Sequence, residues 1–575
     1  MDYKIKYDNW ISDSRLCKEG SDELLAIKDN EKEIEYRFGA ELAFGTAGMR
    51  GLIGYGTNEI NIYTVRRATK GLAEYIKSLG EKAMKRGVAI SYDTRKFSDV
   101  FAKDAAGVLL KNGIKVYLYS EARPVPMLSF AVRELNCIAG IMITASHNPK
   151  EYNGYKVYGE DGAQMSPEAT AEVVKHIKEI TDYLSVELID IKNSLIKHHN
   201  LEIISYGFEK KYYKTVAKLA LSKKAVKKFG KKVKIVYTPI HGSGYTPVTK
   251  VLGKLGINIE IVQEQVKPDP AFSTVEVPNP ENKEALTLGI KLANEVNADV
   301  VFGTDPDSDR LGVAIRDDNG EFMALTGNQT GILLLNYILS RLQEKGDLPK
   351  NGVAIKSFVS TGLAKGICDN YGVELVDVPV GFKFIGEKIK QYEQDKSKTF
   401  LFGFEESCGY LRGTHARDKD AVVASMLFAE MVCYYNSIGK NIYQVLMGIY
   451  EKYGFCQDVT ENIMYSGLTA MQDMNDKIHQ MSLKDIKNFD IFNVIAERDY
   501  QIGLRTVFES GAEEPLEFKN INCLYYELEN DSFICLRPSG TEPKMKIYYC
   551  IKGKDKKHVE KSIEIVKTAF AKEIK

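Results

Sequence analysis

Three aspartates alternate with other residues in the segment GTDPDSDR, which directly follows a run typical of a buried strand. They are Asp305, Asp307 and Asp309. Unpaired carboxylates about 4 Å apart repel each other by about 4 kcal/mol per pair at an effective dielectric of about 20, and a bound cation relieves this repulsion. Oxygen ligands favour Mg²⁺, Mn²⁺ or Ca²⁺ over zinc. An EF-hand needs Gly and Glu where Arg310 and Arg316 stand, so the segment indicates Mg²⁺ beside a phosphate, with a solvated acidic turn as the weaker alternative.

A serine stands just beyond another predicted strand, in ITASHNPKEYNGYK at residues 143–156. Ser146 lacks the G-x-S-x-G surroundings of a hydrolase nucleophile, so acyl transfer is disfavoured. A hydroxyl at a strand end can instead carry a phosphoryl group where a cation or basic side chains neutralise the charge. An ordinary turn built from Ser, Asn and Pro is an equally good interpretation of this segment by itself.

Two segments of the third quarter of the chain carry polar groups suited to a phosphorylated sugar. GFEESCGY, residues 403–410, presents Glu405 and Ser407, which could bind neighbouring sugar hydroxyls. HARDKD, residues 415–420, presents His415, Arg417 and Lys419, which could bind phosphate or move a proton. A charged helix start is a fair alternative for the second segment.

Two glycine-containing segments near the chain ends each hold an arginine. RPSGTEPK, residues 537–544, combines the components of an anion cradle, although a plain β-turn also fits. LAFGTAGMRG, residues 42–51, carries Arg50, and its glycines could serve backbone geometry alone. The chain has neither GxxxxGK[ST] nor GxGxxG. A phosphoryl group would therefore come from the substrate or from the protein.

Short β-rich runs alternate with longer amphipathic segments along most of the chain, the pattern of βαβ units around mostly parallel sheets. The expected strands of the three similar blocks lie near residues 87–93, 114–120, 139–146, 233–239, 257–262, 298–305, 352–360, 373–380 and 399–407. A different final block has strands near 532–537 and 544–551 and then a charged helix. We expect an α/β protein whose domains span residues 1–205, 206–320, 321–453 and 454–575. The polar segments follow strands, where open α/β sheets bind ligands.

Composition limits the classes of function. A chain of 575 residues has room for about three to four domains. Lys+Arg and Asp+Glu both number 78, so no basic field attracts nucleic acid, and the lysine-rich residues 223–234 fit a solvated helix before a strand. The longest apolar stretch, 421–435, is too short for a bilayer and the first residues lack a secretory signal, so we expect a cytoplasmic protein without a membrane partner. Nine scattered cysteines without a CxxC pair indicate packing residues rather than disulfides or zinc.

Nine motifs together resemble the α-D-phosphohexomutase family, in its long phosphoglucomutase branch that includes phosphopentomutase-like members. In chain order they are FGTAGMRG, TASHNP, NGYK, GTDPDSDR, TGNQTG, GFKFIGEK, GFEES, ARDKD and RPSGTEPK. The resemblance covers nearly the whole chain. It implies four domains around a central cleft, three with similar α/β cores and mixed, mostly parallel sheets, and a smaller α+β lid at the C-terminus.

The resemblance also implies roles for individual residues. Ser146 is the phosphoserine and a metal ligand, and the three aspartates hold Mg²⁺. The residues around the transferred group are Arg50, His147, Lys156 and Arg310, with Lys156 as the preferred proton shuttle. The substrate-binding residues are Glu405, Ser407, His415, Lys419, Arg537, Ser539, Gly540 and Thr541. Val380 stands where many relatives have Thr, which puts the sugar preference in question.

The implied reaction interconverts α-D-glucose 1-phosphate and glucose 6-phosphate, with glucose 1,6-bisphosphate as activator and intermediate. Phosphorylated monosaccharides are the expected partners, and the chain is expected to be a monomer or homodimer. Pentose or mannose phosphates are alternative substrates, so a phosphopentomutase or phosphomannomutase stays open. A Mg²⁺-dependent sugar phosphatase would release free phosphate, and a sugar-phosphate sensor would bind without turnover.

Overall fold

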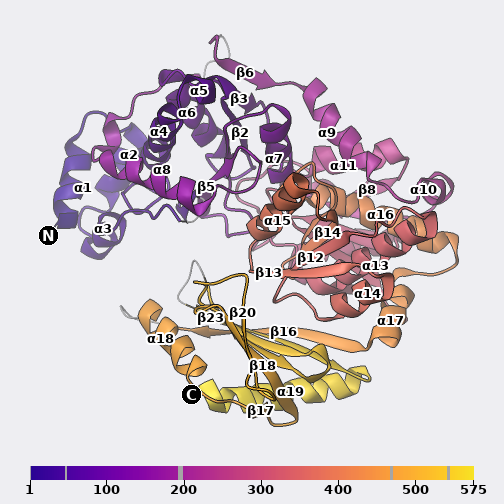
Figure 1. Cartoon of the computed structure of the whole chain (residues 1–575). Coiled ribbons are helices and arrows are strands. Elements are labelled where there is room, and N and C mark those ends of the chain that lie inside the picture. Colours follow the sequence, from indigo (N-terminus) through magenta and orange to yellow (C-terminus); the bar gives the residue numbers. More distant parts are fainter. Residues whose placement is uncertain (1, 46–47, 192–197, 466–469, 540–543, 575) are drawn as a thin grey trace. The chain divides into compact units, whose positions relative to one another are not determined.

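The computed structural model describes residues 2–45, 48–191, 198–465, 470–539 and 544–574. The chain forms two compact units. The first unit comprises Met1–Thr326, Ile385–Lys396 and Cys408–Gly439, and the second comprises Gly327–Phe384, Ser397–Ser407 and Lys440–Lys575. Figure 1 labels the helices and strands of both units.

The first sheet has the strand order β1-β5-β4-β2-β3-β6. Its strands are β1 (Gly48–Leu52), β2 (Val88–Tyr92), β3 (Val116–Tyr119), β4 (Ala139–Ile143), β5 (Tyr152–Gly159) and β6 (Leu201–Ile204). The four strands β4, β2, β3 and β6 run parallel to one another. Strand β5 pairs antiparallel with β4, and β1 pairs antiparallel with β5. Every residue of β2, β3 and β4 is buried, as expected for parallel strands covered on both faces.

Helices cover both faces of this sheet. They are α4 (Ile62–Ser78), α5 (Glu81–Arg86), α6 (Ser98–Lys111), α7 (Val125–Glu134) and α8 (Pro167–Glu179). Helices α6 and α7 both contact β2 and β4, and Figure 1 shows them on opposite sides of the strands. Three further helices precede the sheet, α1 (Asp2–Ser12), α2 (Lys18–Ala26) and α3 (Glu31–Phe38). They enclose an aromatic cluster around Trp10, Phe38 and Tyr63.

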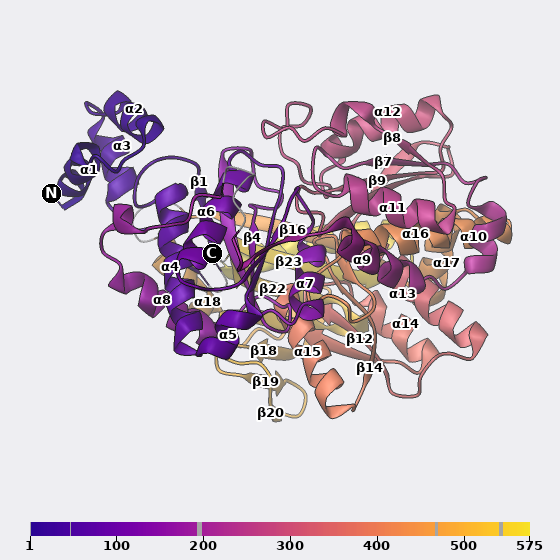
Figure 2. The ribbon, with the colours of Figure 1, turned by 90° about the horizontal axis from the view of Figure 1, so that it is seen from above.

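The second sheet, also in the first unit, has the order β11-β10-β9-β7-β8. Its strands are β7 (Ile235–Thr238), β8 (Ile259–Ile261), β9 (Val300–Thr304), β10 (Leu311–Arg316) and β11 (Phe322–Leu325). The associated helices are α9 (Tyr206–Lys218), α10 (Lys223–Phe229), α11 (Tyr245–Leu255), α12 (Thr287–Glu295) and α16 (Ala421–Ser437). Figure 2 shows α12 beside β8, β7 and β9, with α11 on the other side of these strands. Gly409 of the short strand β15 (Gly409–Leu411) forms an isolated antiparallel β-bridge with Arg310.

The second unit begins with the third α/β layer. Strand β12 (Gly352–Ser357) pairs in parallel with β13 (Glu374–Val378) and β14 (Thr399–Glu405). Helices α13 (Gly327–Lys345), α14 (Leu363–Tyr371) and α17 (Ile442–Tyr453) pack together beside it. Helix α15 (Phe382–Asp395) begins in the second unit and continues into the first.

An antiparallel sheet completes the second unit, in the order β16-β23-β22-β21-β18-β19-β20 with β17 beside β18. Its strands are β16 (Phe455–Met464), β17 (Asn488–Phe489), β18 (Phe492–Asp499), β19 (Leu504–Val507), β20 (Glu513–Pro515), β21 (Leu524–Leu528), β22 (Phe533–Pro538) and β23 (Lys544–Gly553). Helices α18 (Ala470–Ser482) and α19 (Lys556–Ile574) share its apolar core (Figure 1).

The expected fold class is confirmed, with three α/β layers followed by a sheet-rich C-terminal domain. The lysine-rich residues 223–234 form α10 and the turn before β7, as the helix-then-strand interpretation expects. The stretch 421–435 forms most of buried α16. Among the described residues, no single helix has the length and apolar character needed to cross a bilayer. The four domain boundaries stay predictions.

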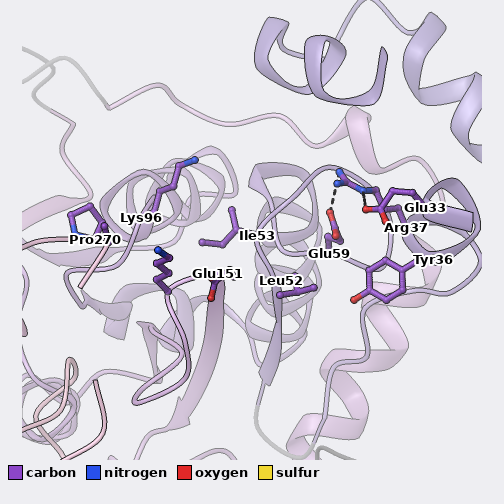
Figure 3. A pocket seen from close by; sticks show the side chains of 11 residues that line it. Glu33, Tyr36, Arg37, Leu52, Ile53, Glu59, Lys96, Glu151 and Pro270 are labelled. Carbon is purple, nitrogen blue, oxygen red and sulfur yellow. Dashed lines mark hydrogen bonds and ion pairs between the residues drawn. The ribbon is translucent and has the colours of Figure 1, made fainter. Parts of the chain in front are cut away.

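A hollow of about 580 Å³ in the first unit holds a buried carboxyl group (Figure 3). Arg37 on α3 pairs with Glu33 at 2.8 Å and with Glu59 at 3.4 Å. Glu59 is only 3% exposed, and its Oε2 has no hydrogen-bond partner among the described residues. Burial outweighs Arg37 and raises the pKa of Glu59 to about 7. The hollow contains none of the predicted site residues.

Glu59 should make the stability of the protein depend on pH. A raised carboxyl pKa means that the folded chain holds the proton more tightly, so stability is full below pH 4.5 and falls as pH rises through about 7. The fall is on the order of 3 kcal/mol. The Glu59→Gln variant should lose this contribution, so melting temperatures at pH 5 and pH 8 should differ less than in the wild type. Glu81→Gln is the control, because Glu81 pairs with Lys85 and does not line the hollow. An unchanged pH dependence in Glu59→Gln would contradict the assignment.

Candidate active site

Ser146 and the aspartate triplet meet in the first unit, at the carboxyl ends of two parallel-sheet strands. Ser146 follows β4 and Asp305 follows β9 directly. Ser146 Oγ donates a hydrogen bond to Asp305 Oδ2 at 2.8 Å and lies 3.3 Å from His147 Nδ1. Ser146 is 4% exposed. The two sequence motifs therefore form a single site, although 159 positions separate the two residues.

The three aspartates are almost completely buried and lie close together. One carboxylate oxygen from each lies within 4.8 Å of the others. Asp305 Oδ1 accepts hydrogen bonds from two backbone N–H groups of its own turn. Lys156 Nζ lies 2.9 Å from Asp307 Oδ2, and Lys419 Nζ lies 3.2 Å from Asp309 Oδ2. The interpretation as a solvated acidic turn is thereby wrong, because exposure of the triplet does not exceed 2%.

The turn that carries the triplet depends on close backbone approach. A Cβ on Gly242 would lie 2.6 Å from Pro306 Cα, so only glycine fits beside the turn. Ser243 donates two hydrogen bonds to the carbonyl of Pro306. Ser146 and Ser308 both have positive φ, 53° and 49°. Such left-handed serines cost about 1–3 kcal/mol each and persist where the surroundings determine them, often at functional sites.

Burial and mutual repulsion determine which of these groups ionise. Burial and the neighbouring Asp307 and Asp309 charges hold the pKa of Asp305 well above its ordinary value. Burial also opposes ionisation of Asp307, but Lys156 outweighs it and holds that pKa below the ordinary range. Burial, with Arg310 and Arg50 nearby, holds the pKa of His147 well below its usual value, so the imidazole is neutral at pH 7.

A divalent cation fits this donor set. Asp307 Oδ1 and Asp309 Oδ1 are buried and have no hydrogen-bond partner among the described side chains. Buried carboxylate oxygens without partners are costly, and a cation would satisfy both. All the donors are oxygens, counting Ser146 Oγ, which suits Mg²⁺ rather than zinc.

A network that supports the serine loop was not identified from the sequence. Arg95 has a fully buried side chain and donates hydrogen bonds to the carbonyls of Ser146 and Asn148, each at 2.5 Å. It also donates to two further carbonyls of the loop. Asp93 accepts from Thr144 Oγ1 at 2.6 Å, and Thr144 Oγ1 in turn accepts from Ser146 N. The sequence signal for this network was the polar run DTR, residues 93–95, immediately after β2, which ends at the same sheet edge as β4.

The other predicted site residues of the first unit each contact a different polar partner. Arg50 Nη1 donates to Asn148 Oδ1 at 2.8 Å, and Arg310 pairs with Glu281. Lys419 forms an ion pair with Asp309 of the triplet. His415 Nε2 lies 2.8 Å from Asp420 Oδ2, on the residue that caps α16.

Arg417, the remaining cation of the HARDKD segment, is about 1% exposed and pairs with Glu393 on α15. Its guanidinium also donates to the carbonyl of Thr414. These contacts link two segments of the first unit and do not include the serine or the triplet.

The other predicted substrate-binding residues lie in the second unit. Glu405, at the end of β14, accepts from Gly381 N at 2.8 Å, which joins GFEES to the segment that carries Val380. Ser407 follows in the turn after β14. Arg537 lies beside Tyr548, and Ser539 N donates to Lys544 O at 2.8 Å. Gly540 and Thr541 lie outside the described residues.

Comparison with known proteins identifies the class that this fold and site define. Models of phosphoglucomutase/phosphomannomutase α/β/α domains I, II and III match residues 41–184, 210–320 and 326–453. The chain belongs to the phosphoglucomutase/phosphomannomutase family and is a phosphosugar mutase.

Two relatives are phosphoglucomutases of Staphylococcus. The chain is 36% identical to the Staphylococcus haemolyticus enzyme over 94% of this chain and 95% of that one. It is 35% identical to the Staphylococcus aureus USA300 enzyme over 91% and 92%.

Two solved structures share the fold. A family protein of Burkholderia thailandensis has a TM-score of 0.65 at 16% identity, covering 93% of this chain and 98% of that one. Paramecium parafusin, a phosphoglucomutase in its open form, has a TM-score of 0.64 at 16% identity, covering 92% and 95%.

Arg95 should act as a positioning residue for the serine loop. Its planar guanidinium reaches four carbonyls that a lysine cannot satisfy together, so Arg95→Lys should let the serine shift. Displacement of about 1 Å can cost about 10²-fold in rate, and we expect that loss in kcat with little change in KM. Arg86→Lys is a matched control, because Arg86 also donates to two backbone carbonyls of this domain. Equal kcat values for Arg95→Lys and the wild type would contradict the role.

Proposed function

We propose that the chain is a phosphoglucomutase that interconverts α-D-glucose 1-phosphate and glucose 6-phosphate through a phosphoserine at Ser146. The observation that carries the proposal is the 2.8 Å hydrogen bond from Ser146 Oγ to Asp305 within the buried triplet. The Staphylococcus relatives support the choice of a hexose phosphate. Glucose 1,6-bisphosphate is the proposed intermediate and activator.

The residues divide the chemistry between them. Asp305, Asp307 and Asp309 would hold Mg²⁺, which supplies positive charge against the oxygens of the transferring phosphoryl group. The bond between Ser146 Oγ and phosphorus breaks as a sugar hydroxyl oxygen bonds to phosphorus. The hydroxyl releases its proton, and Ser146 Oγ gains one. Lys156, held 2.9 Å from Asp307, is the proposed shuttle for these protons.

Neighbouring groups keep the serine oxygen in position. Neutral His147 lies 3.3 Å from Ser146 Oγ, close enough to orient it without adding charge. Arg50 and Arg310 add positive charge for the phosphoryl oxygens. The bisphosphate would then reverse its orientation and return its other phosphoryl group to Ser146.

Further residues of the family motifs are proposed to bind the substrate. Glu405 and Ser407 are proposed to bind sugar hydroxyls. Arg537 and Ser539 are proposed to bind the phosphate that is not reacting, together with Gly540 and Thr541 of the same motif. His415 and Lys419 are proposed as further substrate contacts. Val380 bears on sugar preference, so pentose and mannose phosphates remain the alternative substrates. Cytoplasmic location and a monomeric or homodimeric state stay predictions.

Removal of the serine hydroxyl should abolish turnover without unfolding the protein. Ser146→Ala should lower kcat on glucose 1-phosphate by on the order of 10⁴-fold or more, with glucose 1,6-bisphosphate and Mg²⁺ present. Ser78→Ala is the control, because Ser78 donates only to a carbonyl of its own helix end. Undiminished activity in Ser146→Ala would refute the phosphoserine.

The same assay tests the substrate and the reaction type. The kcat/KM for glucose 1-phosphate should exceed that for ribose 1-phosphate and mannose 1-phosphate. A higher value for the pentose would make the chain a phosphopentomutase. Release of inorganic phosphate in place of isomerisation would make it a phosphatase, and binding without turnover would make it a sensor.

A further inference from the structure

Two cysteines and an aspartate share one face of the C-terminal sheet, far from the aspartate triplet in the sequence. Cys456 and Asp458 lie two residues apart on β16, and Cys550 lies on β23 directly opposite Asp458. Side chains alternate between the faces of a strand, and directly opposed residues point to the same face. The ladder register therefore brings these three side chains together.

Their polar atoms converge on one point. Both sulfurs and a carboxylate oxygen of Asp458 lie within 4.8 Å of one another, and the two sulfurs are 3.3 Å apart. Asp458 Oδ1 is buried and has no hydrogen-bond partner among the described residues. Such an atom is costly unless a cation or a donor satisfies it. The hydroxyl of Thr361 lies 3.5 Å from Cys456 Sγ and offers a further oxygen.

We propose that Cys456, Cys550 and Asp458 form a second metal site, which binds a thiophilic divalent cation of the Zn²⁺ class. Two thiolates and a carboxylate are ligands that zinc accepts, whereas Mg²⁺ prefers oxygen alone. Each thiol releases its proton to solvent when its sulfur bonds to the metal, so binding two thiolates releases two protons. The site differs from the oxygen-only triplet in the metal that it selects.

A disulfide is a poorer explanation of the same cysteine pair. Cys456 is opposite Lys552 and Cys550 is opposite Asp458, so the two cysteines are diagonal neighbours across the ladder. Diagonal neighbours lie about 7–8 Å apart, whereas two cysteines whose Cα atoms are more than about 7 Å apart need backbone movement to form a disulfide. A metal ion between the sulfurs spans a larger separation than a sulfur–sulfur bond does.

The site lies where the C-terminal sheet meets the third α/β layer, within the second unit. Gly362 N, at the start of α14, donates to Cys550 Sγ at 3.3 Å. A Cβ on Gly362 would lie 2.5 Å from Asp531 O, so the two parts are in close backbone contact. Strand β16 continues directly from α17 through Gly454 (Figure 1). A metal ion at this site would hold the C-terminal sheet and the third α/β layer together.

The chain contains a matched control pair. Cys523 lies just before β21 and Cys535 lies on the neighbouring strand β22. Their sulfurs are 3.4 Å apart, and both residues are buried. Cys535 is opposite Tyr525, so this pair is also diagonal. No carboxylate joins Cys523 and Cys535 in a cluster of possible metal ligands among the described residues. Because a thiol pair without a carboxylate does not indicate a metal site, we expect no metal binding at Cys523 and Cys535.

Cobalt binding tests the proposal on the full-length, metal-free, reduced protein with saturating Mg²⁺ present. Co²⁺ bound by thiolates gives an intense charge-transfer absorption that an all-oxygen site cannot give. We expect one equivalent of Co²⁺ to produce it and Zn²⁺ to remove it. Cys456→Ser and Cys550→Ser should each abolish it, and Asp458→Asn should weaken Co²⁺ binding at least tenfold. Cys535→Ser should leave it unchanged. Absence of the band in the wild type, or its persistence in a Cys456→Ser/Cys550→Ser variant, would overturn the proposal.

A second measurement uses only the wild type, so its result does not depend on whether the variants fold. Zn²⁺ should slow alkylation of Cys456 and Cys550 by iodoacetamide at least tenfold, as mapped by peptide mass spectrometry. It should leave the rates at Cys523 and Cys535 unchanged. Equal slowing at all four cysteines would indicate general stabilisation and would contradict a site at Cys456 and Cys550.

Discussion

Three carboxylates buried within one turn are the constraint on which this site depends. Charges so close together in a poorly solvated place cannot all remain ionised unless positive charge accompanies them. The first unit supplies Lys156 from β5 and Lys419 from the segment before α16. These cations leave two buried carboxylate oxygens without hydrogen-bond partners in the described part of the chain. A metal ion would bind these oxygens and neutralise the remaining negative charge. Ser146 lies where its oxygen could bind the same ion.

The sheet architecture brings the aspartates and Ser146 together in one candidate active site. Strands β4 and β9 each end in a polar loop, and the two loops are joined by hydrogen bonds from Ser146 to Asp305 and from Thr144 to Asp307. Arg95 holds the serine loop by donating hydrogen bonds to its carbonyls, and these bonds do not involve the serine hydroxyl. The positive φ of Ser146 is stable because this network determines it. Rigid support of this kind is what a phosphoryl carrier requires, since its oxygen must return to the same position in each cycle.

Sequence patterns predicted the strands and the loops that carry Ser146 and the aspartates, because burial and turn chemistry are local properties. They did not predict contacts that depend on register or on chain crossings. Arg95 was missed because a polar residue after a strand is common, and its role follows only from a loop 51 residues away. Cys456 and Cys550 were interpreted as packing residues for the same reason, since 94 positions separate two strands that pair directly. The mixed strand directions in the first sheet also arise from tertiary pairing, and they were predicted from the family resemblance rather than from periodicity.

The central claim is that the phosphoryl group on Ser146 shares one metal ion with Asp305, Asp307 and Asp309. Electron–nuclear double resonance on the phosphorylated protein, with Mn²⁺ in place of Mg²⁺, measures this directly. The account predicts a ³¹P hyperfine coupling to bound Mn²⁺ that is present without substrate and absent in Ser146→Ala, which should still bind the ion. Bound Mn²⁺ without a ³¹P coupling in the fully phosphorylated wild type would contradict the account.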